Sequence, residues 1–145
     1  MDPSFQPQNR LVGFLAIWLW APCPALGLTV TALIPADYQA VPLTTGARYH
    51  TDGAETITAI PPALAGGTLI QTEAADGSNP GLSVRFDVDT RAEVYVCYDA
   101  RSAAPAWLSS WVGTDMVVGV SDGAVGHYGV YARRFDAGTV SLSAN

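Results

Sequence analysis

The sequence predicts an all-β fold, an antiparallel sandwich of two sheets with Greek-key or jelly-roll connections and about eight short strands. Short apolar runs alternate with polar residues at the two-residue period of half-buried strands. Turn-forming pairs that contain Gly, Pro or Asp separate these runs. No apolar stripe with helical spacing continues for three turns, so the pattern contains no amphipathic α-helix.

The first three expected strands cover residues 28–33, 55–60 and 68–72. The first, LTVTAL, alternates apolar residues with threonine, which is typical of a strand with one buried face. The other two stand on either side of a break that contains Pro61-Pro62 and Gly66-Gly67. Proline and glycine interrupt regular structure, so the break separates two strands.

Residues 82–88 and 93–98 form the clearest pair of expected strands. The first segment reads LSVRFDV with strict alternation, and the second reads EVYVCY with an almost unbroken apolar run. The short turn Asp89-Thr90-Arg91 lies between them, which predicts that the two strands pair as a hairpin.

The last three expected strands cover residues 116–120, 128–135 and 139–142. Asp122-Gly123 separates the first from the second, and Ala137-Gly138 precedes the third. Glycine-containing breaks of this kind mark turns between short strands.

Residues 1–27 have the pattern of a secretory signal peptide. Leu11–Ala21 is an unbroken apolar run after Arg10, and as a helix it would rise about 16 Å, too little to span a bilayer. Prolines follow the run, and small residues precede an expected cut before Leu28. We therefore expect residues 28–145 to be one secreted domain, extracellular or periplasmic, without membrane attachment after the cut. An uncleaved signal anchor is the less favoured alternative.

Composition limits the partners of this domain. Of the 145 residues, 49% are hydrophobic, which suffices for the core of one domain. Thirteen acidic residues stand against seven arginines and no lysine, giving a net charge of −6. This balance argues against nucleic acid and anionic membranes as partners, because no basic patch is present to release their counterions.

Cys97 is the one cysteine that remains after the expected cut, since Cys23 lies in the removed segment. No intramolecular disulfide can then form, so the core must hold the fold together. Cys97 stands inside the apolar run at 93–98, which favours a small buried hydrophobe over a reactive thiol.

Several segments resemble a known family. They are Val94–Arg101 (VYVCYDAR), Pro105–Leu108 (PAWL), Tyr131–Asn145 (YARRFDAGTVSLSAN), Thr56–Leu64 (TITAIPPAL) and Leu69–Thr72 (LIQT). In this combination the chain resembles a small β-sandwich accessory module found on exported bacterial carbohydrate-active enzymes and cell-surface proteins. The likeness covers nearly all of residues 28–145. It implies a domain that binds glycan and has no activity of its own, so we expect the chain not to be an enzyme.

Four residues are candidate ligand contacts. Trp111 and Trp107 are candidates because exposed flat aromatic rings stack on sugar faces. Trp111 stands in a loop-like setting that would present its ring, whereas Trp107 is favoured as a core residue beneath the loop. Asp99 and Arg101 follow the strand at 93–98, where they would hydrogen-bond sugar hydroxyls, and a structural ion pair is the alternative.

No cofactor or metal is expected. Asp87, Asp89 and the loop Asp76–Asn79 resemble fragments of calcium sites, but neither place supplies the roughly six to eight oxygen ligands that Ca²⁺ needs. Turn chemistry is therefore favoured over a structural calcium ion. His50 and His127 lack the spacing of a metal site and are expected at the surface.

Catalytic patterns are missing from the sequence. No serine stands in a G-x-S-x-G elbow, and so small a domain rarely forms a deep cleft with two carboxylates flanking a glycosidic bond. We therefore expect an exported, non-catalytic module that binds polysaccharide or a cell-surface glycan. The alternative is a structural or adhesive subunit that self-associates through sheet edges. A small metal-dependent or hydrolytic enzyme ranks third.

Overall fold

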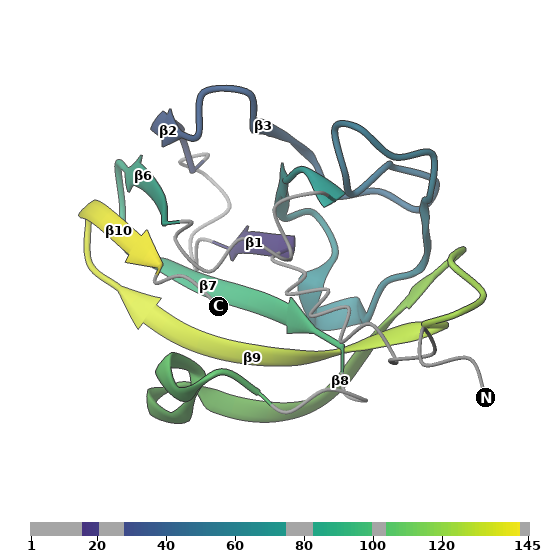
Figure 1. Cartoon of the computed structure of the whole chain (residues 1–145). Coiled ribbons are helices and arrows are strands. Elements are labelled where there is room, and N and C mark those ends of the chain that lie inside the picture. The colour runs from purple at the N-terminus through teal and green to yellow at the C-terminus, as the bar shows by residue number, and fades with distance from the viewer. Residues whose placement is uncertain (1–15, 21–27, 75–82, 100–103, 143–145) are drawn as a thin grey trace, which may run out of the picture.

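Two packed sheets make up the part of the chain that the computed structural model describes, residues 16–20, 28–74, 83–99 and 104–142 (Figure 1). The larger sheet has seven strands and the smaller sheet has three. Every pair of neighbouring strands is antiparallel. The predicted all-β sandwich is confirmed.

The strands of the larger sheet are, in spatial order, β3 (Gln39–Pro42), β5 (Thr68–Gln71), β1 (Ala16–Trp20), β7 (Ala92–Tyr98), β9 (His127–Phe135), β8 (Val112–Val120) and β4 (Ile57–Ala59). Those of the smaller sheet are β10 (Gly138–Leu142), β6 (Val84–Val88) and β2 (Val30–Ile34). In the described part of the chain, the short 3₁₀-helices η1 (Pro62–Leu64) and η3 (Ala106–Ser110) lie between strands. Among the described residues, no helix is long and apolar enough to cross a membrane.

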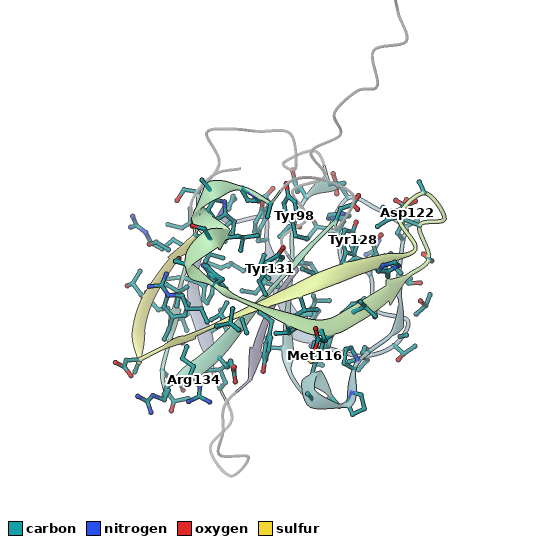
Figure 2. All side chains as sticks on the ribbon, turned by 90° about the horizontal axis from the view of Figure 1, so that it is seen from below. Tyr98, Met116, Asp122, Tyr128, Tyr131 and Arg134 are labelled. Atoms are coloured by element: carbon teal, nitrogen blue, oxygen red, sulfur yellow. The ribbon has the colours of Figure 1, made fainter. Side chains whose placement is uncertain are left out.

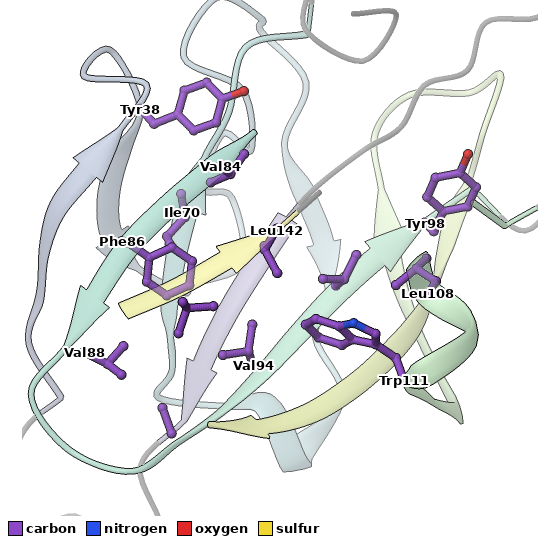
Figure 3. Close-up of a cluster of buried hydrophobic side chains, with 13 residues drawn as sticks. Tyr38, Ile70, Val84, Phe86, Val88, Val94, Tyr98, Leu108, Trp111 and Leu142 are labelled. Carbon is purple, nitrogen blue, oxygen red and sulfur yellow. The ribbon is translucent and has the colours of Figure 1, made fainter. Parts of the chain in front are cut away.

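The larger sheet curls (Figure 1). A hydrophobic core lies on each of its faces. The inner core takes its buried residues from the larger sheet and its loops: Leu43, Tyr49, Ile57, Leu64, Leu69, Tyr95, Cys97, Val118, Val120, Tyr128, Val130 and Ala132. The inter-sheet core adds residues of β6 and β10 (Figure 3): Tyr38, Ile70, Val84, Phe86, Val88, Ala92, Val94, Val96, Tyr98, Leu108, Trp111, Val140 and Leu142.

The two kinds of strand pattern in the sequence correspond to one or two buried faces. In β6, buried Val84, Phe86 and Val88 alternate with less buried residues, because only one face of the smaller sheet meets a core. In β7, Tyr95 and Cys97 enter the inner core while their neighbours enter the inter-sheet core. A strand buried on both faces has an unbroken apolar run, which is what the sequence shows here.

The predicted hairpin between β6 and β7 is wrong. Strand β6 pairs with β10 and β2 in the smaller sheet, whereas β7 pairs with β1 and β9 in the larger one. Residues 89–91 therefore lead from one sheet to the other. The two strands meet face to face across the inter-sheet core, and this packing buries the apolar face of β6.

Two strands were not expected from the sequence. Strand β3 ends in Pro42 at the edge of the sheet, which is the position where a strand tolerates proline. Strand β1 lies within the apolar run expected to form the signal peptide, and it pairs with β5 and β7. The cut before Leu28 stays a prediction, and in the full chain Ala16–Trp20 is a central strand.

Phe86 tests the inter-sheet core. Its side chain is fully buried, so Phe86→Ala should lower the free energy of unfolding by about 3–5 kcal/mol through lost burial and a cavity. Val112 is 68% exposed, and Val112→Ala should change the free energy of unfolding by no more than about 0.5 kcal/mol. Urea unfolding followed by tryptophan fluorescence measures both variants. Equal losses would contradict the assignment of core and surface.

Candidate functional site

Helix η3 brings Trp107 and Trp111 together at one side of the larger sheet. Their ring centroids are 5.9 Å apart with an interplanar angle of 78°, the edge-to-face arrangement that aromatic pairs favour. The Trp111 ring also lies 5.8 Å from the ring of Phe135 in β9. The two indoles therefore form one aromatic unit that rests on β9.

Strand β9 presents a row of three side chains beside this unit. Tyr131, Arg133 and Phe135 occupy alternate positions, so they share one face of the strand over about 13 Å. Tyr131 and Phe135 are partly buried against the inter-sheet core, and Arg133 is exposed. We call Trp107, Ser110, Trp111, Tyr131, Arg133 and Phe135 the tryptophan face.

Arg133 is held in position within the tryptophan face. Its guanidinium carbon lies 5.3 Å from the centroid of the Phe135 ring, a cation–π contact. Its Nη1 donates a hydrogen bond to Ser110 Oγ at 3.3 Å, and that hydroxyl donates to the carbonyl oxygen of Trp107 at 3.3 Å. The cation is therefore oriented beside aromatic rings while it stays open to solvent.

Two buried polar atoms close to the tryptophan face have no hydrogen-bond partner among the described residues: the indole nitrogen of Trp107 and the hydroxyl of Tyr98. Tyr98 lies beside Leu108 in the inter-sheet core (Figure 3). Burial raises the pKa of Tyr98, and Asp99 and Tyr131 raise it further, so its hydroxyl keeps its proton at neutral pH. Both atoms are donors that lack an acceptor, which is uncommon for buried groups.

The expected exposure of Trp111 is wrong. The side chain is 8% exposed and belongs to the inter-sheet core, while Trp107 is the partly exposed indole. Strand β8 begins directly after Trp111, so the chain turns its ring inward onto Phe135 instead of leaving it in a loop. A sugar contact by Trp107 stays a prediction.

Asp99 does not join the two tryptophans. It follows Tyr98 at the end of β7 and is 2% exposed. It stands two positions after Cys97, so alternation along the strand puts it on the inner-core side, and its carboxylate raises the pKa of both Tyr98 and Tyr128. Arg101 lies outside the described residues. The structure thus brings together two of the four predicted contacts.

The sequence does contain a signal for the residues that were missed. Tyr131–Phe135 reads YARRF, in which the first, third and fifth residues alternate with others, as on one face of a strand. What the pattern does not tell is that η3 packs beside this face. Ser110 and Phe135 gain their roles only through that packing.

A second polar group of residues is buried at the end of the larger sheet where β9 begins. The Tyr49 ring lies 4.8 Å from that of His50 and 6.1 Å from that of Tyr128. The two tyrosine hydroxyls share a hydrogen bond. Figure 2 shows Tyr128 and Asp122 at this end of the molecule, away from Arg134.

His50 is 6% exposed, so its expected position at the surface is wrong. Its Nδ1 lies 3.3 Å from the carbonyl oxygen of Thr72, just after β5, and backbone pairing with Thr72 draws His50 inward. Burial lowers the pKa of His50, and Asp52, Glu55 and Asp122 only partly oppose this. The imidazole is therefore neutral at neutral pH, and its Nδ1 lies 3.3 Å from both the carbonyl oxygen and the hydroxyl oxygen of Thr72, so the tautomer decides which of the two it bonds.

The same surroundings keep the tyrosines protonated. Burial, together with Asp122 and Glu55, raises the pKa of Tyr49 to about 12. Burial also raises the pKa of Tyr128, again with Asp122 contributing. Within the described residues, no group of three or more His, Cys, Asp or Glu side chains is placed to hold a metal ion. This end of the sheet is therefore a neutral, hydrogen-bonded cluster under a rim of carboxylates.

The two aspartates considered for calcium, Asp87 and Asp89, make hydrogen bonds that hold strands and turns together. Asp87 accepts a hydrogen bond from Thr139 Oγ1 at 2.7 Å, and Asp89 accepts one from the backbone N–H of Thr29 at 2.9 Å. The loop at 76–79 lies outside the described residues.

Two predictions about single residues are confirmed. Cys97 is fully buried in the inner core, and burial raises the pKa of its thiol, so it is a small hydrophobe and not a reactive thiolate. His127 is exposed, as expected, and the structure makes it the first residue of β9.

The buried imidazole predicts a pH dependence of stability. In the unfolded chain His50 titrates near 6.5, and in the folded chain its pKa is lower, so the unfolded state binds more protons between these values. The free energy of unfolding should therefore fall as pH drops from 7.5 through 6.5, and level off below the folded pKa. Urea titrations between pH 7.5 and 5.5 measure this slope.

His50→Asn keeps an amide donor for Thr72. The free energy of unfolding of this variant should lose most of its dependence on pH. His127→Asn is the matched control at an exposed position and should retain it. An unchanged slope in His50→Asn would show that another group causes the dependence.

Comparison with known proteins gives one similar structure. No family model matches the chain, and no curated protein matches it. Among solved structures, the chain is similar to one described as a GH138 enzyme targeting pectin rhamnogalacturonan II. The TM-score is 0.59 at 18% identity, and the match covers 81% of this chain and 15% of that one. The likeness shows a shared fold, and the chain spans about 15% of the length of that enzyme.

This comparison corrects one expectation. The prediction that the chain is not an enzyme is contradicted, because the solved structure that it resembles is that of a glycoside hydrolase. The β-sandwich of this chain has a counterpart within a carbohydrate-active enzyme.

Proposed function

We propose that this chain is an exported β-sandwich domain that binds polysaccharide at the tryptophan face. The observation that carries the proposal is the row of Tyr131, Arg133 and Phe135 beside Trp107, which combines partly exposed rings with an oriented cation. Aromatic rings bind the apolar faces of sugars, and polar groups at their edges bind hydroxyls. The sequence resemblance to accessory modules and the shared fold with a carbohydrate-active enzyme both support this function.

Arg133 indicates the class of sugar. A guanidinium group binds a carboxylate through two parallel, charge-assisted hydrogen bonds. A neutral sugar has no carboxylate for such a pair. The similar enzyme is described as targeting pectin rhamnogalacturonan II. We therefore take the ligand to be an acidic pectic polysaccharide whose carboxylate binds Arg133 while a neighbouring sugar ring packs on Trp107.

The net negative charge of the chain restricts where an acidic polysaccharide can bind. The chain carries a net charge of −6, so an anionic polymer is repelled at long range and is attracted only where a cation is fixed at the surface. Raising the salt concentration screens the distant repulsion more than the contact at Arg133, because the contact is shorter than a Debye length. Moderate salt should therefore preserve binding at the tryptophan face.

Arg133→Ala tests the proposal against a matched control on the same strand. Arg134 is also exposed but is one residue along β9, so it belongs to the opposite face of the strand. Arg133→Ala should weaken binding of acidic pectin about 10- to 100-fold through loss of charge-assisted hydrogen bonds, and Arg134→Ala should bind nearly as the parent does. Affinity electrophoresis in gels containing pectin fractions of different uronate content measures both.

Trp107→Ala extends the test to the aromatic part of the face. It should weaken binding of acidic and neutral pectin fractions alike, because ring packing does not depend on a carboxylate. Unfolding curves must show that both variants remain folded. Equal migration of the parent in all gels would contradict the proposal. Concentration-dependent growth in light scattering without any sugar would then favour the structural subunit.

A further inference from the structure

Strand β1 lies between β5 and β7 in the larger sheet (Figure 1). Three of its residues pair with β5 and five pair with β7, all antiparallel. Since β5 and β7 each run antiparallel to β1, they run parallel to one another, and they lie about 9–10 Å apart, two inter-strand spacings. We call the space between them the β5–β7 slot.

Hydrophobic core lies on both sides of the β5–β7 slot. The register places Ile17 between Ile70 and Val96, which are fully buried in the inter-sheet core. At the preceding position of each strand, Leu69 of β5 and Tyr95 of β7 are buried in the inner core. A strand in the slot is thus flanked by apolar side chains at successive positions. A charged or unpaired polar side chain there would be buried without compensation.

Removal of residues 1–27 would leave this slot without a strand. The facing edges of β5 and β7 would then carry unpaired N–H and C=O groups next to two cores, where each such group is costly. Direct closure would shift β5 by about 5 Å. That shift is opposed by hydrogen bonds that hold the end of β5 to the preceding loop, from Gln71 Nε2 to Arg48 O at 2.7 Å and from Thr51 N to Thr72 O at 2.8 Å.

We propose that, once residues 1–27 are removed, the β5–β7 slot is an acceptor site for an extended apolar segment of a separate polypeptide. The segment runs antiparallel to β7, has five successive residues without charge or proline, and gains backbone hydrogen bonds on both sides. Ala16–Trp20, which occupies the slot in the full chain, shows the sequence that it accepts. The proposal rests on removal of that segment and does not depend on glycan binding at the tryptophan face.

A full-length chain with a protease recognition sequence inserted before Leu28 tests this inference. The chain is folded, cut, and mixed with a dye-labelled peptide that contains Ala16–Trp20 between flanking lysines. We expect the original N-terminal fragment to co-elute with the rest of the chain after cutting. In mild urea the labelled peptide should replace it, one peptide per chain, while the amides of β5 and β7 stay protected from hydrogen exchange.

A control peptide with Trp18→Asp has an aspartate at the position whose register partners are Leu69 and Tyr95. It should bind at least about 100-fold more weakly, because the charge would be buried without a partner. Equal uptake of the two peptides would overturn the proposal. So would a cut chain that loses its fragment, binds no peptide, and keeps the amides of β5 and β7 protected, since the sheet would then close unaided.

A disulfide test checks the register in the uncut chain. Ala16 is the register partner of Cys97, so Ala16→Cys in a Cys23→Ser background should crosslink to Cys97 when the chain refolds under mild oxidation, before burial shields the Cys97 thiol. Ile17→Cys is the matched control, because its register partner is Val96 and it belongs to the other face of the strand. Mass spectrometry of proteolytic fragments reads both variants. Crosslinking from Ile17→Cys instead of Ala16→Cys would overturn the register on which the proposal depends.

Discussion

Burial of strand β7 on both faces is the constraint on which the rest of the structure depends. Val94 and Val96 need cover from one side, and Tyr95 and Cys97 need it from the other. The larger sheet covers Tyr95 and Cys97 by curling on itself. The smaller sheet covers Val94 and Val96 by packing across the larger one (Figure 1). One doubly buried strand therefore requires both the curl and the second layer.

The tryptophan face follows from the limited width of the smaller sheet. The smaller sheet has three strands against seven, and in the part of the chain that the structure describes β9 lies beyond β7 with η3 packed on its outer side. The inner face of β9 is closed by the curl, since Tyr128, Val130 and Ala132 belong to the inner core. The alternate residues of β9 are left partly open. The same arrangement that buries β7 thus exposes one row of β9 to solvent.

Much of the fold could be predicted because alternation records how many faces of a strand are buried. The eight expected strands correspond to β2 and β4 to β10 in the structure. What local pattern does not record is which sheet a strand joins, so the β6–β7 turn was misassigned to a hairpin. It also does not separate an apolar strand from an apolar helix, which is why Ala16–Trp20 was assigned only to a leader.

The candidate site was harder to predict because its residues depend on tertiary packing. Trp111 was misplaced because flanking serine and glycine residues suggested a loop. His50 was misplaced because its spacing indicated no metal site and so suggested the surface, while the fold turns both rings inward.

The order of the strands in the smaller sheet has a kinetic consequence. Its strands β2, β6 and β10 come from the beginning, middle and end of the chain, so it cannot be completed until the C-terminal residues are available. Closure of such long-range pairs slows folding, and until then Phe86 and Val94 lack their cover. During synthesis the inter-sheet core therefore stays open until the residues of β10 have left the ribosome.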